Sequence, residues 1–78
     1  MSRTIELKNE DKETCTMHIV KVNGIQLHIM QHKSGSVSMN VHGMGSGMTN
    51  RISLHDVKVT KRMKRVGSTA WTSIEVVE

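Results

Sequence analysis

The chain has 78 residues, a net charge of +4 and seven methionines, but no Phe or Tyr and a single Trp. This length predicts one small domain over residues 1–78, in the size range where buried surface barely outweighs chain entropy. A disulfide framework typical of small secreted proteins is excluded, because Cys15 is the only cysteine, and no segment approaches the roughly 18 apolar residues of a membrane span. We therefore expect a cytoplasmic protein without a membrane anchor. Its methionine-rich core predicts modest stability, unless a partner or a homo-oligomer adds to it.

The first half of the chain alternates apolar and polar residues, which predicts strands. Residues 3–8 form the first expected strand. Residues 14–22 and 25–31 flank Asn23-Gly24, a pair typical of a type I′ turn because Asn tolerates positive φ and Gly adopts it freely. A β-hairpin is therefore expected here.

A fourth strand is expected over residues 37–42, and the glycine-rich Gly43–Gly47 that follows is interpreted as a flexible loop. Alternation resumes at Arg51 and slips at His55-Asp56, which predicts a bulge or bend.

The remainder of the chain is expected to form a second hairpin. Alternation continues over Val57–Val66, although the helix propensity of Lys and Arg makes a basic helix the alternative there. Gly67-Ser68 then predicts a turn, and residues 70–76 a last strand.

These elements predict an all-β fold: a small, single-domain, mostly antiparallel five- or six-stranded twisted sheet or partly open barrel, since closing a sheet removes exposed edges. Val22–Leu27, with the sequence Val-Asn-Gly-Ile-Gln-Leu, resembles the strand-turn-strand opening of the Hfq branch of the Sm-like RNA-binding family, and Val37–Val41 is similar to an Sm strand. The resemblance implies a small twisted β-barrel. The chain departs from that family in lacking its N-terminal helix signal and its Tyr-Lys-His segment, where Asn50-Arg51-Ile52 stands. No ring assembly or binding residue is carried over.

Basic side chains concentrate in the middle of the chain. Residues 33–68 hold seven basic residues and one acidic residue, whereas residues 1–32 hold four of each. Five basic residues fall within Lys58–Arg65, a cluster typical of a nucleic-acid patch. An edge strand protected against aggregation has a similar composition.

A two-residue turn at Gly67-Ser68 would place Lys64 opposite Trp71 and Arg62 opposite Ser73. The outward face would then carry Lys58, Arg62, Lys64 and Trp71, and the core face Val57, Val59, Met63, Ala70, Ile74 and Val76. Trp71 would be a stacking platform for an unpaired base beside cations. A register slip of one residue would instead bury Trp71 in the core, where tryptophan is more often found.

We therefore predict a non-enzymatic binding module for nucleic acid, either RNA or single-stranded DNA. The predicted contact residues are Arg51, Lys58, Lys61, Arg62, Lys64, Arg65 and Trp71. The alternative is a protein-binding inhibitor or adaptor, of the kind that phages and other mobile elements encode, acting on an acidic host protein surface. No catalytic motif is complete, and Gly43–Gly47 lacks the Lys-Ser/Thr ending of a phosphate-binding P-loop, so neither enzymatic activity nor a cofactor is expected.

A soft-metal site is a further alternative. In the first hairpin, Cys15 would face His32 and Met17 would face Met30 on one side of the ribbon. Thiolate, thioether and imidazole ligands suit Cu(I), or zinc if the thioethers do not coordinate the metal. The spacings CxxC and HxxxH are absent, so no metal is predicted and Cys15 is expected to be a buried or half-buried free thiol.

Overall fold

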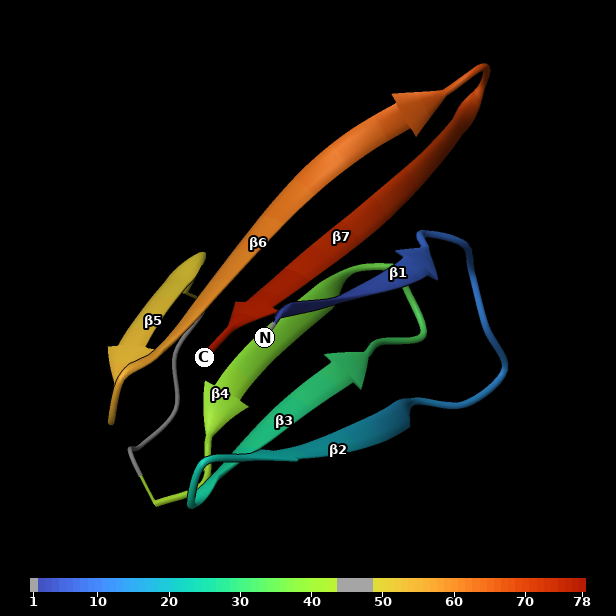
Figure 1. Cartoon of the computed structure of the whole chain (residues 1–78). Helices are drawn as coiled ribbons and strands as arrows, with labels where there is room; N and C mark the ends of the chain where they lie inside the picture. The colour runs from blue at the N-terminus through green and yellow to red at the C-terminus, as the bar shows by residue number, and fades with distance from the viewer. Residues whose placement is uncertain (1, 44–48) are drawn as a thin grey trace.

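The computed structural model describes residues 2–43 and 49–78, which form seven strands in two antiparallel sheets (Figure 1). One sheet has the order β1-β7-β6-β5 and contains β1 (Ser2–Lys8), β7 (Thr69–Val77), β6 (Val57–Val66) and β5 (Arg51–Leu54). The other has the order β2-β3-β4 and contains β2 (Thr16–Val22), β3 (Ile25–Gln31) and β4 (Val37–Val41).

The prediction of an all-β, mostly antiparallel fold is confirmed, but its finer form is wrong. Seven strands in two layers replace the predicted five- or six-stranded sheet or partly open barrel, so the barrel implied by the Sm-like resemblance is not formed. Residues 44–47 of the loop expected at Gly43–Gly47 lie outside the described residues. In the described part of the chain, no helix is long and apolar enough to cross a membrane.

The additional strand arises at His55-Asp56. These residues have φ values of 51° and 63°, and Leu54 pairs directly with Val57 across them. The segment is therefore a two-residue hairpin turn with both residues in the left-handed region, not the expected bulge or bend. The helical alternative for Val57–Val66 is also wrong, since β6 spans that whole range.

The registers of the two predicted hairpins are confirmed. Asn23 and Gly24 have φ values of 46° and 81°, and the pairing of β2 with β3 sets Met17 opposite Met30. The pairing of β6 with β7 sets Lys64 opposite Trp71. Because side chains alternate between faces along a strand, these registers fix which residues share a surface.

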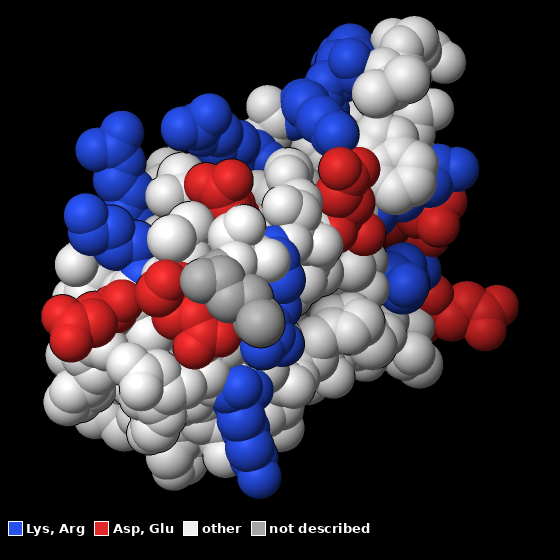
Figure 2. All heavy atoms as spheres, in the orientation of Figure 1, with Lys and Arg blue, Asp and Glu red and all other residues white. Residues whose placement is uncertain are grey.

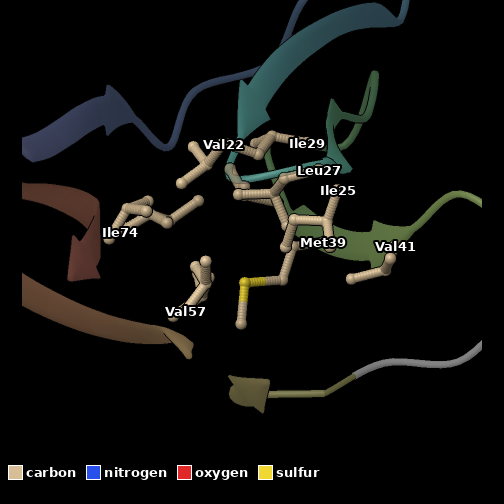
Figure 3. Close-up of a cluster of buried hydrophobic side chains, with 11 residues drawn as sticks. Val22, Ile25, Leu27, Ile29, Met39, Val41, Val57 and Ile74 are labelled. Atoms are coloured by element: carbon tan, nitrogen blue, oxygen red, sulfur yellow. The ribbon is translucent and has the colours of Figure 1, made fainter. Parts of the chain in front are cut away.

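The core lies between the inner faces of the two sheets (Figure 3). Its most buried side chains are Leu27, Ile29 and Met39 from one sheet and Val57, Val59, Ile74 and Val76 from the other. The predicted core face of the second hairpin is therefore confirmed near its base. It fails at Met63, which is 71% exposed, because the end of the β6-β7 hairpin extends past the opposing sheet (Figure 1).

Polar contacts connect the two layers at both ends. At one end, Thr72 Oγ1 donates to Asn9 Oδ1 at 2.9 Å, and Asn9 Nδ2 donates to the Gly35 carbonyl at 2.8 Å. At the other end, two hairpin turns meet, where Asn23 Nδ2 donates to the His55 carbonyl at 2.6 Å. These bonds hold the four-stranded sheet in a fixed position over the three-stranded one.

Candidate nucleic-acid interface

The outer face of the four-stranded sheet collects basic side chains from β6. Val57 and Val59 point into the core with no exposed surface, so alternation directs Lys58, Arg62 and Lys64 to the opposite side. All three of these basic residues are exposed. β6 is therefore apolar inward and cationic outward at its base, as predicted.

Neighbouring strands extend this face through the sheet register. Trp71 of β7 pairs with Lys64 on one side and with Lys8 of β1 on the other. Arg51 of β5 pairs with Thr60, which also points outward. The indole is half-buried and lies on the outer face between two lysines in register, not in the core.

Lys61 and Arg65 lie on the opposite face of β6 from the other predicted contact residues. Lys61 is half-buried, and its Nζ donates to the Val37 carbonyl of β4 at 2.9 Å, so this lysine connects the two layers. Arg65 is exposed near the end of the hairpin. The structure thus brings together five of the predicted residues: Arg51, Lys58, Arg62, Lys64 and Trp71.

Carboxylates lie among these cations. Lys64 Nζ contacts Glu6 Oε1 at 3.0 Å, and Lys8 Nζ contacts Glu10 Oε2 at 3.5 Å. Exposed ion pairs of this kind contribute only about 0–1 kcal/mol, so a phosphate can displace the carboxylate at little cost. Figure 2 shows basic side chains gathered along the β5 and β6 side of the molecule with carboxylates between them.

Comparisons with protein-family models, curated proteins and solved structures find no match to this chain.

A shallow hollow of about 100 Å³ lies on the same outer face. It is lined by Thr4, Thr60, Arg62, Ser73 and Glu75. The hydroxyls and the guanidinium are suitable hydrogen-bond donors for a phosphate oxygen, whereas the carboxylate of Glu75 repels an anion. On this face, the strands carry five basic side chains, including Lys8, and two acidic ones, Glu6 and Glu75, so its net charge is positive.

Lys8 and Glu6 are the site residues that sequence reasoning missed. Both belong to β1, whose place beside β7 depends on pairing between the two ends of the chain. No turn motif joins these strands, so only their shared alternation could have suggested the contact.

Of the residues of the soft-metal alternative, Met17 and Met30 lie on the outer face of the three-stranded sheet, whereas Cys15 precedes β2 and is outside its pairing with β3. Cys15 is exposed, so the expected burial of its thiol is wrong. Met17, Met30 and His32 line a hollow of about 230 Å³. His32 Nε2 is hydrogen-bonded to Ser38 Oγ at 2.9 Å. Over residues 2–43 and 49–78, no three His, Cys, Asp or Glu side chains form a group that could hold a metal ion.

Proposed function

We propose that the protein is a non-enzymatic module that binds single-stranded nucleic acid on the outer face of the β1-β7-β6-β5 sheet. The observation that carries this proposal is the row formed by Lys8, Trp71 and Lys64, with Arg62 in the next outward position along β6. Stacking of a base on an aromatic ring contributes about 1–3 kcal/mol and accepts any base, while the cations neutralise adjacent phosphates.

An unpaired strand suits this surface better than a duplex. Trp71 lies on an open sheet face, and the faces of bases in a duplex are hidden in the stack, whereas a single strand can splay a base onto an indole. Because stacking on an indole accepts any base, we expect little sequence preference.

Binding of labelled oligothymidine and oligouridine, followed by fluorescence anisotropy at low ionic strength, tests the proposal. Trp71→Leu is expected to weaken binding roughly 5- to 150-fold, the equivalent of about 1–3 kcal/mol. Lys64→Gln is expected to weaken it too. The matched control is Lys33→Gln, which removes the same charge from the exposed turn between β3 and β4. Failure of the native protein to bind either oligonucleotide would reject the proposal.

An acidic protein segment is a second candidate partner. The pairing of β5 with β6 ends at Thr60, and the Lys61 N–H still donates to the Asn50 carbonyl at 2.8 Å. Residues 62–66 of β6 then have no strand on that side among the described residues. An extended acidic peptide could pair with this cationic edge. A pull-down with and without nuclease separates the candidates, since a protein partner retained after nuclease favours the peptide and loss of all bound material favours nucleic acid.

A further inference from the structure

Strand β2 is a long sheet edge with little protection against pairing. The sheet orders leave β1, β5, β2 and β4 as edge strands of the described residues, and residues 62–66 of β6 form a further open edge that carries Arg62, Lys64 and Arg65. β1 contains three charged side chains, and β5 and β4 have only four and five residues. β2 has seven residues, no proline, and Lys21 as its only Lys, Arg, Asp or Glu. Charges, prolines and short length are the usual means by which native edges avoid self-association.

The free backbone groups of β2 follow from the hydrogen bonds of β3. The Gln26 carbonyl accepts from the His42 N–H at 2.9 Å, on the β4 side, so Gln26 directs its backbone away from β2. The direction of the backbone N–H and C=O groups alternates along a strand. The backbone groups of the even-numbered residues of β3 therefore point to β4, and those of the odd-numbered residues bond to β2. In the observed register, the β2 residues left with backbone groups at the open edge are Met17, Ile19 and Lys21.

The same residues present exposed apolar side chains. Met17 is 47% exposed and Ile19 is 56% exposed, and both lie on the outer face of the sheet. In Figure 2, the part of the surface over β2 and β3 is largely uncharged. Adjacent exposed apolar side chains on an unpaired strand are typical of an interaction site.

This edge is complementary to itself. If a second copy of β2 runs antiparallel with Ile19 opposite its own counterpart, Met17 of each copy faces Lys21 of the other. Each of these three pairs joins residues whose backbone groups are free, which allows about six hydrogen bonds, two from each pair. No like charges face each other, and the aliphatic stem of Lys21 can cover the thioether opposite.

We propose that the protein forms a two-fold symmetric dimer through β2, in which the β2-β3-β4 sheets of two copies become one continuous sheet. Stable complexes typically bury about 1,200–2,000 Å² of accessible surface, and pairing of two edge strands buries less. The fraction of dimer is therefore expected to depend on protein concentration. The nucleic-acid surface proposed above lies on the other sheet and stays accessible. A dimer would present two such surfaces to one strand.

Sedimentation equilibrium of nuclease-treated protein over a range of concentrations tests the proposal. Ile19→Lys sets two ammonium groups opposite each other at the symmetry axis and is expected to weaken dimerisation about tenfold or more. Met63→Lys is the matched control, because Met63 is exposed on the other sheet and receives the same charge. Circular dichroism of both variants verifies that each keeps its fold.

Disulfide trapping provides a second measurement that does not depend on destabilising the dimer. In a Cys15→Ser background, Ile19→Cys would place two thiols across the axis in a pair with Cα atoms about 5.5 Å apart, within disulfide range. We expect this variant to cross-link much faster than Met63→Cys. Equal cross-linking rates, or a native protein that stays monomeric at every concentration, would overturn the proposal.

High salt distinguishes this proposal from the proposed function. A dimer held by backbone bonds and apolar contact is expected to persist at salt concentrations that release a polyanion. Association that disappears in high salt would contradict the β2 dimer, whatever the outcome of oligonucleotide binding.

Discussion

Replacing Asn9 by alanine is expected to destabilise the fold by about 2–3 kcal/mol, because the Asn9 amide connects the two sheets. Its Oδ1 accepts from Thr72 Oγ1 at 2.9 Å and its Nδ2 donates to the Gly35 carbonyl at 2.8 Å. A typical hydrogen bond contributes about 0.5–1.5 kcal/mol, and leaving a buried hydroxyl without an acceptor costs about 1–3 kcal/mol. Thr72 is 1% exposed, so water cannot readily replace the lost amide.

Urea and thermal unfolding, followed by the fluorescence of Trp71, measure this loss. For a domain of this size, the expected fall in Tm is roughly 8–24 °C. Asn40→Ala is the matched control, because Asn40 lies on the outer face of β4 and its side chain makes no hydrogen bond within the described residues. We expect Asn40→Ala to change the free energy of unfolding by about 0.5 kcal/mol or less.

A double-mutant cycle isolates the contact. Thr72→Val removes the hydroxyl that Asn9→Ala leaves unpaired, so the two substitutions together should cost less than their sum, by about 1 kcal/mol. Additive effects, or an Asn9→Ala variant as stable as the native protein, would refute the assignment of Asn9 as the connection between the layers.

Three further substitutions test the fold by urea unfolding. Gly35 has φ +92°, and an added Cβ would lie 3.0 Å from the Glu10 backbone, so Gly35→Ala should lower the free energy of unfolding by about 1–3 kcal/mol. Gly24→Ala should lower it less, because Gly24 has φ +81° but a Cβ there would meet no atom of the described chain within 4 Å. Ile74 is fully buried, so Ile74→Ala should cost about 2–5 kcal/mol, well above any comparable change at an exposed position. Lys61→Met removes the hydrogen bond to β4 and should lower the free energy of unfolding by about 1 kcal/mol. Its affinity for the oligonucleotide should stay unchanged. A loss of binding would contradict the placement of this lysine outside the nucleic-acid surface.

The local part of the fold was predictable because turn chemistry sets register. Asn23-Gly24 and Gly67-Ser68 each fix a hairpin, and the second places Lys64 opposite Trp71 as the sequence predicted. The turn at His55-Asp56 was missed because neither residue is glycine, although both adopt positive φ. Tight turns without glycine have a weak sequence signal.

The remaining differences involve contacts between distant segments. Alternation assigned Met63 to an apolar face but could not show that the opposing sheet ends before reaching it. It also could not pair β1 with β7, which brings Lys8 beside Trp71. Charge counting grouped Lys61 with its neighbours, although strand alternation directs it toward β4.

Comparison of Arg62→Gln with Arg65→Gln tests the central claim most directly. Both arginines are exposed on β6 and three positions apart, but only Arg62 lies on the outer face with Trp71. For each variant, the affinity for oligothymidine is measured over a series of salt concentrations. The loss of one phosphate contact should reduce the slope of log K against log salt by about 0.7. We expect this reduction for Arg62→Gln and almost none for Arg65→Gln. Equal reductions for both variants, or none for Arg62→Gln, would contradict binding on the outer face of the sheet.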